Sequence, residues 1–160
     1  MHVNAYLHFD GQCEEAFKFY EQALGGKIEC LLVHEGTPVA NFVPAEWQKK
    51  IMHARLVVGD QALMGCDTPP EHYRKPAGFS VSLDIKEPRE ADRIFQELSK
   101  NGSVTMPIQE TFWAVRFGMA LDRFGIPWII NCARAACLET RWPFRDHFTG
   151  RKRRCRHRSG

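Results

Sequence analysis

The feature that most constrains the fold of this 160-residue chain is an internal repeat with an offset of 75 residues. Residues 13–24 carry apolar side chains at the spacing of one helical face, and the segment that begins at Pro88 carries a matching set. The matched positions are Ala16, Phe19, Tyr20 and Ala23 in the first half and Ala91, Ile94, Phe95 and Leu98 in the second. In each half the helix follows one strand-like segment and precedes three others. The pattern predicts two tandem βαβββ modules, and therefore a fold of the α+β class.

Turn-forming residues set the boundaries of these elements. Gly25-Gly26 and Asn101-Gly102 end the two helices, because glycine and asparagine accept the left-handed conformation. Residues 68–78 have the composition of a linker, so we expect one module over residues 1–67 and another over 79–132. The predicted strands are residues 3–9, 27–34, 51–58, 61–66, 79–85, 104–109, 112–121 and 126–132, and residues 35–50 are a predicted loop.

This architecture has a consequence for function. A four-stranded sheet with one helix buries one face against that helix and leaves the other face open. Two such sheets, paired through their open faces, enclose a cavity in which a small ligand can bind. We therefore expect paired βαβββ modules that enclose a cavity.

The charge of the chain is divided unequally. Nine basic residues against two carboxylates after residue 132 give +7, so residues 1–132 carry −4 of the total of +3. We expect residues 133–160 to form a basic, disordered tail. Its arginines are competent for nucleic acid, but the acidic body offers no basic face to extend such a footprint. A nucleic-acid partner is therefore not favoured.

Composition also bears on the cellular compartment. Six cysteines include no Cys-x-x-Cys pair, which favours buried thiols in a reducing compartment over disulfides or metal ligands. No apolar run reaches the roughly 18 residues of a membrane helix, and the N-terminus has no secretory signal pattern. We expect a cytoplasmic protein that does not bind a membrane.

A motif near the end of the second module resembles a known family. Glu110-Thr-Phe-Trp113 is followed by Asp122-Arg-Phe-Gly125, then Trp128 and Asn131. This pattern resembles the PhnB-like branch of the vicinal-oxygen-chelate superfamily, which includes glyoxalases, bleomycin-binding proteins and fosfomycin-resistance proteins. The resemblance covers about residues 1–132 and implies the paired-module fold, commonly as a homodimer.

The resemblance also implies where a metal would bind. Metal-dependent members take His, Gln or Glu ligands from the first and last strands of their modules. The corresponding positions here are Ala5 and Ile129, and neither side chain can donate an electron pair to a divalent cation. We therefore predict no metal ligands and no evident cofactor, with a divalent metal bound in another way as an open alternative. Strand alternation is expected to place His8 on the opposite face from Ala5.

Several residues are candidates for ligand binding. His53 and Arg55 share a strand face, on which His53 is a candidate acid and Arg55 a clamp for an anion; equally, this polar face can lie in water. The resemblance places Trp113 and Arg116 beside the cavity. Asn131 shares a strand face with Ile129. The predicted ligand-binding set is Leu7, His53, Arg55, Trp113, Arg116 and Asn131.

Two functions follow from these features. One is a small-molecule-binding protein of the bleomycin-resistance type without an evident metal site. The other is an enzyme of the lyase, isomerase or dioxygenase type, metal-dependent or metal-free, that acts on a small organic substrate. Proteins of this kind are sometimes labelled methyltransferases, but the sequence has no glycine-rich nucleotide-binding motif.

Overall fold

The computed structural model describes residues 3–134, so the predicted disorder of the basic tail lies almost entirely outside the described residues. Each half of the chain folds as a βαβββ module, as predicted. The first module comprises β1 (Ala5–Phe9), α1 (Cys13–Leu24), β2 (Lys27–Val33), β3 (Ile51–Val58) and β4 (Gln61–Asp67). The second comprises β5 (Val81–Asp84), α2 (Pro88–Ser99), β6 (Ser103–Gln109), β7 (Ala114–Leu121) and β8 (Pro127–Ala133). The offset of 75 is confirmed, because both helices span matching positions.

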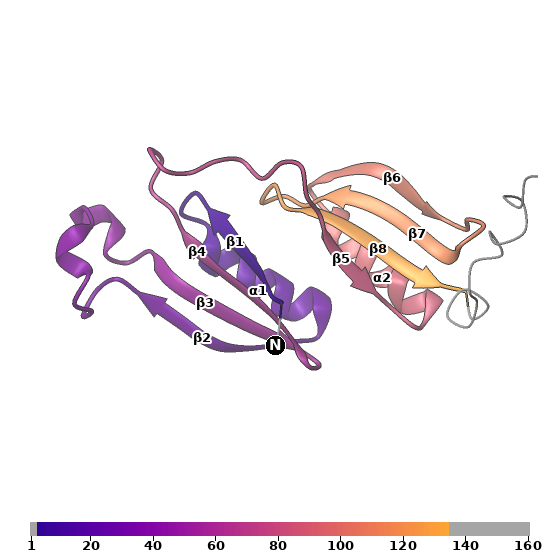
Figure 1. The fold of residues 1–160 in the computed structure, drawn as a ribbon, viewed down its shortest axis with the longest axis horizontal. Coiled ribbons are helices and arrows are strands. Elements are labelled where there is room, and N and C mark those ends of the chain that lie inside the picture. The colour runs from indigo at the N-terminus through magenta and orange to yellow at the C-terminus, as the bar shows by residue number, and fades with distance from the viewer. Residues whose placement is uncertain (1–2, 135–160) are drawn as a thin grey trace, which may run out of the picture.

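Each module forms one four-stranded sheet with the same topology. The strand orders are β1-β4-β3-β2 and β5-β8-β7-β6. The first strand of each module pairs in parallel with the last, and the other pairs are antiparallel. Figure 1 shows the two sheets side by side, each with its helix behind it. Among the described residues, no helix lies over the opposite face of either sheet, as the sequence predicts.

The modules differ most in the connection between their second and third strands. Residues 34–50 join β2 to β3, whereas only residues 110–113 join β6 to β7. The longer connection is not wholly irregular, since it contains two short 3-10 helices, Ala40–Phe42 and Ala45–Trp47. The predicted loop is therefore confirmed in place but has local structure of its own.

The core of the first module forms where α1 packs on its sheet. The predicted helical stripe is confirmed at Ala16, Tyr20 and Ala23, all of which are buried. Phe17 also fills this core, although the sequence analysis assigned its place to Phe19. Phe19 is only half-buried, and its ring lies 5.8 Å from the ring of Phe124 in the second module. Phe19 therefore belongs to the contact between modules.

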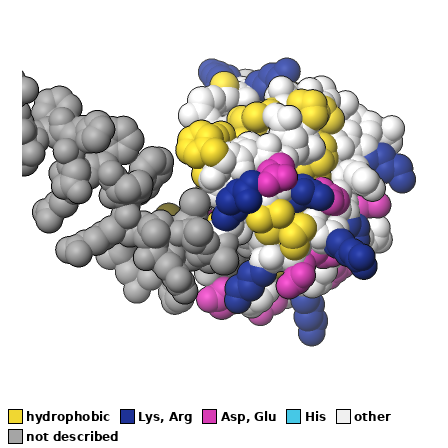
Figure 2. All heavy atoms as spheres, turned by 90° about the vertical axis from the view of Figure 1, so that its right-hand side faces the viewer, with side chains coloured by type: hydrophobic (Ala, Val, Ile, Leu, Met, Phe, Trp, Pro, Cys, Tyr) yellow, Lys and Arg dark blue, Asp and Glu magenta, His cyan; other side chains and the backbone are white. Residues whose placement is uncertain are grey.

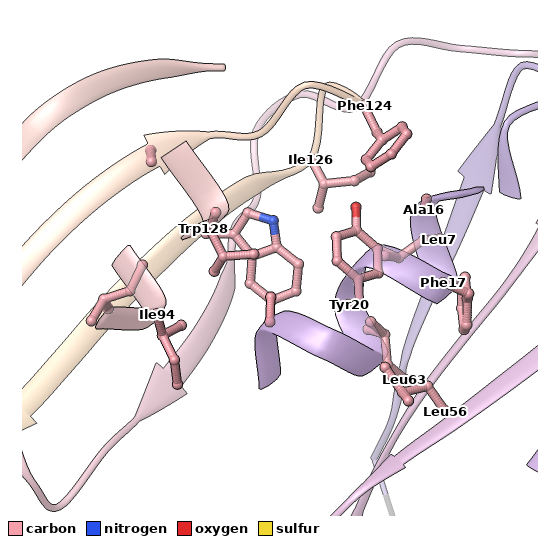
Figure 3. Packing of buried hydrophobic residues seen from close by; sticks show 14 of the residues in the cluster. Leu7, Ala16, Phe17, Tyr20, Leu56, Leu63, Ile94, Phe124, Ile126 and Trp128 are labelled. Atoms are coloured by element: carbon pink, nitrogen blue, oxygen red, sulfur yellow. The ribbon is translucent and has the colours of Figure 1, made fainter. Parts of the chain in front are cut away.

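A buried carboxylate, Asp122, organises the contact between the modules. One of its oxygens accepts hydrogen bonds from the Tyr20 hydroxyl at 2.6 Å and the Trp128 indole at 2.8 Å. The other accepts the backbone N–H groups of Phe124 and Ile126, both at 2.9 Å. Figure 3 shows Tyr20 reaching from α1 toward Trp128, Ile126 and Phe124. Because four donors from two modules converge on it, Asp122 fixes how the modules meet.

A second buried carboxylate, Asp67, ties the elements of the first module together. It accepts the backbone N–H of Cys13, at the start of α1, at 2.8 Å and that of Ile51, at the start of β3, at 2.9 Å. The first N–H groups of a helix have no partner within the helix, so this carboxylate replaces a local cap. Burial raises the pKa of Asp67, although these hydrogen bonds oppose the shift.

Candidate functional site

The face of the first sheet that α1 does not cover, here called the first open face, carries a group of polar side chains. Alternation in β1 buries Leu7 and Phe9 under α1 and turns Tyr6 and His8 outward, so that Tyr6 is 41% exposed. The strand register brings side chains of β3 and β4 beside them. The first open face carries Tyr6, His8, Glu29, His53, Arg55, Met64 and Cys66, with Thr68 at the end of β4.

Two groups of contacts connect these polar side chains. The Tyr6 hydroxyl lies 3.3 Å from His53 Nδ1. His8 Nδ1 lies 2.9 Å from Thr68 Oγ1 and 3.6 Å from the Cys66 sulfur. The rings of Tyr6 and His8 are 5.4 Å apart, which joins the two groups into one cluster. A phenol, two imidazoles, a thiol and a hydroxyl are therefore within reach of one bound molecule.

Arg55 supplies the positive charge of the first open face. Its Nε donates to Glu29 Oε2 at 2.8 Å, and its Nη1 lies 3.9 Å from the Met64 sulfur. Both charged side chains are well exposed, at 39% for Arg55 and 51% for Glu29. An exposed ion pair contributes about 0–1 kcal/mol, so a ligand anion can replace Glu29 at low cost. The predicted sharing of one face by His53 and Arg55 is confirmed.

The tyrosine hydroxyls give a measurable pH dependence. Burial, with a smaller effect of Cys66, raises the pKa of Tyr6 to about 12. Burial also raises the pKa of Tyr20 well above its usual value, and that of Tyr73. We expect tyrosinate absorbance in the folded protein to appear only well above the unfolded midpoint of about 10. Between about 10 and 12 the folded state keeps a proton that the unfolded state loses, so stability falls as the pH rises. A native midpoint near 10 for all three tyrosines would contradict this expectation.

The corresponding face of the second sheet, here called the second open face, is aromatic and apolar. The ring of Trp113 packs edge-on against Phe117 at 5.4 Å. Register places Phe117 opposite Asn131 and Met119 opposite Ile129. Asn131 donates its Nδ2 to Asp84 at 2.8 Å, while its buried Oδ1 has no partner among the described residues. Trp113 and Asn131 thus lie on the uncovered side of the sheet, where the sequence places them.

Two of the predicted ligand-binding residues point away from the open faces. Leu7 is 2% exposed and packs in the core under α1, so its predicted place in a cavity wall is wrong. Arg116 turns toward α2, where its Nε bonds Asp92 at 2.9 Å. Arg116 is in phase with Gly118 and Ala120, which lie under α2, so strand alternation turns it to the helix side. Its predicted ligand contact is therefore wrong as well.

Of the two metal-ligand positions inferred from the family resemblance, one lies on an open face and the other on the helix side of its sheet. Ile129 lies on the second open face beside Asn131, but Ala5 is in phase with the buried Leu7 and faces the helix side of its sheet. His8 lies on the first open face instead. Within residues 3–134, no group of three or more His, Cys, Asp or Glu side chains could hold a metal ion.

A groove of about 700 Å³ lies between the modules. It is bordered by β1 and β5, the two strands at the adjoining sheet edges, and its wall includes Leu24, Ile94 and Trp128 from the helix side. His53, Arg55, Trp113 and Asn131 do not line it. The groove is therefore separate from the open faces on which the candidate ligand-binding residues lie.

Charged side chains of both signs are interspersed at one end of the molecule. Figure 2 views the end of the molecule formed by the second module, where basic and acidic side chains alternate around small apolar areas. This end shows no continuous basic patch among the described residues. In residues 3–134, no helix is long and apolar enough to cross a membrane.

The sequence analysis missed four residues of these faces. Tyr6, His8, Cys66 and Thr68 form most of the polar cluster, and none was predicted to bind a ligand. A signal for two of them was present, because Leu7 and Phe9 alternate with Tyr6 and His8 in the pattern of a strand with one buried face. The spacing taken from the family resemblance gave the opposite phase.

Two βαβββ modules, each with one helix-covered and one open sheet face, define a protein of the glyoxalase and bleomycin-resistance fold in its PhnB-like branch. More particularly, the chain belongs to the family described as 3-demethylubiquinone-9 3-methyltransferase, whose family model matches residues 1–131. Protein YjdN from Escherichia coli is 32% identical over 142 residues, which cover 84% of this chain and 97% of YjdN. The resemblance to the PhnB-like branch is thereby confirmed.

Solved structures support the same fold. The crystal structure of protein PA1353 from Pseudomonas aeruginosa is 47% identical, with a TM-score of 0.76 over 83% of this chain and 98% of that one. The fosfomycin resistance protein FosX from Listeria monocytogenes is only 6% identical, yet has a TM-score of 0.60 over 85% of this chain and 95% of that one. This second likeness shows a common fold and nothing finer.

Proposed function

We propose that this protein binds a small organic anion with an aromatic or apolar body. The observation that supports this proposal is that the two open faces present different chemical groups. The first open face has hydrogen-bonding groups and the Arg55 guanidinium, whereas the second has the rings of Trp113 and Phe117. A ligand between two such faces has its charged end at Arg55 and its apolar body against the aromatic rings.

The two faces come together when a second copy of the chain is present. Within one chain the helices meet each other, as the bond from Arg93 Nη2 to the Ala23 carbonyl at 2.9 Å demonstrates. Each open face is consequently turned away from the contact between its own modules. We propose a homodimer in which the first open face of one chain covers the second open face of its partner. The cavity then has a polar floor and an aromatic roof.

The chemistry of the cavity supports binding ahead of methyl transfer, which the family description names. Arg55 offers a guanidinium whose partner Glu29 is exchangeable, and His53 with Tyr6 offers an imidazole and a phenol that remain hydrogen-bond donors or acceptors at neutral pH. The sequence has no glycine-rich nucleotide-binding motif to hold a methyl donor. Binding of an anionic organic molecule is the function that these residues favour most.

Benzoate, a simple aromatic carboxylate, tests this function. We expect benzoate to quench the fluorescence of Trp113 in a saturable manner, since its ring would lie against the second open face. Substituting Arg55 with alanine should weaken binding by about 1.5–3 kcal/mol, the usual contribution of a hydrogen bond to a charged group in a desolvated site. The measurement is a fluorescence titration of the wild type and of Arg55→Ala.

Two controls make the titration specific. Arg89 lies exposed on α2, so Arg89→Ala removes the same charge without touching either open face and should leave the affinity unchanged. Trp113→Phe should abolish the quenching, because Trp113 is the tryptophan against which the ring of benzoate is expected to lie. Sedimentation equilibrium would test the dimer. Equal affinities for Arg55→Ala and Arg89→Ala, or a monomer at all concentrations, would refute the proposed site.

A further inference from the structure

A thiol, a hydroxyl and an imidazole meet on the first open face in the order needed for proton transfer. The Cys66 sulfur lies 3.6 Å from His8 Nδ1 and 3.8 Å from Thr68 Oγ1, and Thr68 Oγ1 lies 2.9 Å from His8 Nδ1. In the tautomer that carries its proton on Nε2, His8 Nδ1 is an acceptor for either group. An imidazole that accepts a proton from a neighbouring thiol generates the nucleophilic thiolate.

We propose that Cys66 is a nucleophile, activated by His8 with the help of Thr68, that adds to electrophilic carbon atoms of α,β-unsaturated carbonyl compounds bound on the first open face. This inference rests on the proposed function, because it assumes that small organic molecules occupy that face. It adds a covalent activity and a substrate class. The compounds concerned carry a carbon–carbon double bond conjugated to a carbonyl group.

The addition needs no further reactant. His8 Nδ1 takes the thiol proton, directly or through the Thr68 hydroxyl. The Cys66 sulfur then attacks the β-carbon, so that a carbon–sulfur bond forms as the carbon–carbon π bond breaks. The electron pair moves onto the carbonyl oxygen through the α-carbon, giving an enolate. The imidazolium of His8 returns its proton to the α-carbon, and the product is a saturated thioether.

Tyr6 is placed to stabilise the enolate. Its ring lies 5.4 Å from that of His8, on the same open face, and its hydroxyl, whose pKa burial raises from about 10 to about 12, is protonated at neutral pH. A protonated phenol can donate a hydrogen bond to an oxygen that gains negative charge. Tyr6 thus meets the developing oxyanion, while Cys66 meets the carbon.

The other described cysteines lack this arrangement. Cys13 and Cys132 are buried, and burial raises the pKa of both thiols. Cys30 is half-buried on the same sheet face as Arg55, but its thiol makes no hydrogen bond among residues 3–134. Cys30 is therefore an internal comparison for Cys66, with a similar exposure class and no histidine partner.

N-Ethylmaleimide, an α,β-unsaturated dicarbonyl, is the probe. The rate at each cysteine of the full chain is followed by peptide-resolved mass spectrometry over a range of pH. Near pH 7 we expect Cys66 to react about tenfold faster than Cys30, because Cys66, unlike Cys30, has a histidine beside it that can take the thiol proton. His8→Gln and Thr68→Val should each slow Cys66 and move its pH profile upward, with Cys30 unchanged. The other ionisable groups on the first open face are Tyr6, His8, His53, Arg55, Glu29 and Cys30.

A second reagent separates activation of the thiol from stabilisation of the enolate. Iodoacetamide alkylates by displacement and forms no oxyanion, so Tyr6→Phe should slow N-ethylmaleimide but not iodoacetamide at Cys66. His72→Gln, in the linker, is the matched histidine control and should change neither rate. If Cys66 reacts no faster than Cys30, or if His8→Gln and Thr68→Val leave its pH profile unchanged, the proposal is overturned.

The benzoate titration distinguishes this proposal from the proposed function. Benzoate has no electrophilic double bond, so it should quench Trp113 in the wild type without forming an adduct with Cys66. A reactive Cys66 without benzoate quenching would refute the proposed binding mode alone. Benzoate quenching with an unreactive Cys66 would refute the covalent activity alone.

Discussion

Replacing Asp122 with alanine is expected to lower the free energy of unfolding by about 3–5 kcal/mol. The substitution leaves four buried donors without their acceptor, and each unsatisfied buried donor costs about 1–3 kcal/mol before the structure relaxes. Two of these donors, the Tyr20 hydroxyl and the Trp128 indole, come from different modules. The loss should therefore appear in the cooperativity between modules as well as in urea-induced unfolding of the whole chain.

Smaller substitutions calibrate this result. Tyr20→Phe removes one of the four donors and leaves the carboxylate bound by three, so a loss of about 0.5–1.5 kcal/mol is expected. Asp60→Ala, in the exposed turn between β3 and β4, should change stability by no more than about 0.5 kcal/mol. A loss for Asp122→Ala as small as that for Asp60→Ala would show that the modules do not depend on this carboxylate.

The helices and the order of the strands could be predicted because their signals are local. An apolar residue at every third or fourth position specifies a helix face, and the two faces recur at one offset. One residue of this helix face was predicted wrongly: Phe17, and not Phe19, lies in the core. This difference has a physical reason. Both residues are aromatic and neighbours on the helix, and the arrival of Phe124 from the second module gives Phe19 a second place to pack. A contact between modules is not encoded in the periodicity of one helix.

The site residues were harder to predict, because which way a strand side chain points depends on register. A shift of one residue exchanges the two faces of a sheet. Leu7 and His8 were assigned to sheet faces by counting residues back from α1. The turn between β1 and α1 can be one residue longer or shorter, and such a change exchanges the two faces. Arg116 was placed beside the cavity by the family resemblance, yet it is in phase with Gly118 and Ala120 on the helix side of β7. His53, by contrast, shares the first open face with Arg55 as predicted, although the pairing of β2 with β3 is irregular between His53 and Ile51.

The paired turns after the helices show a similar limit. The sequence analysis gave Gly25-Gly26 and Asn101-Gly102 one role, the left-handed conformation. In the structure only the first residue of each pair has it, with φ of 68° at Gly25 and 59° at Asn101. The second residue of each pair is needed for space. A Cβ on Gly26 would lie 2.6 Å from the carbonyl oxygen of Val57, and one on Gly102 would meet that of Leu121.

Gly102→Ala is therefore expected to destabilise the fold by about 3 kcal/mol, at the upper end of the range for overpacking. The atom that a methyl group would meet belongs to the backbone of β7, which cannot rotate aside as a side chain can. To remove this clash, the start of β6 must move away from the end of β7. Asp122, which accepts four hydrogen bonds, directly follows that end. Gly26→Ala should behave similarly at the end of β3. The measurement is chemical unfolding of each variant.

Gly25→Ala is the matched control for these two variants. A Cβ there would meet nothing within 4 Å, so the substitution adds only the strain of the left-handed conformation, about 1 kcal/mol. If close approach decides the role of the second glycine, Gly26→Ala must cost clearly more than Gly25→Ala, although the residues are adjacent. If conformation decides it, the order reverses, because Gly26 does not have a positive φ. The ranking of these neighbouring variants therefore separates the two explanations.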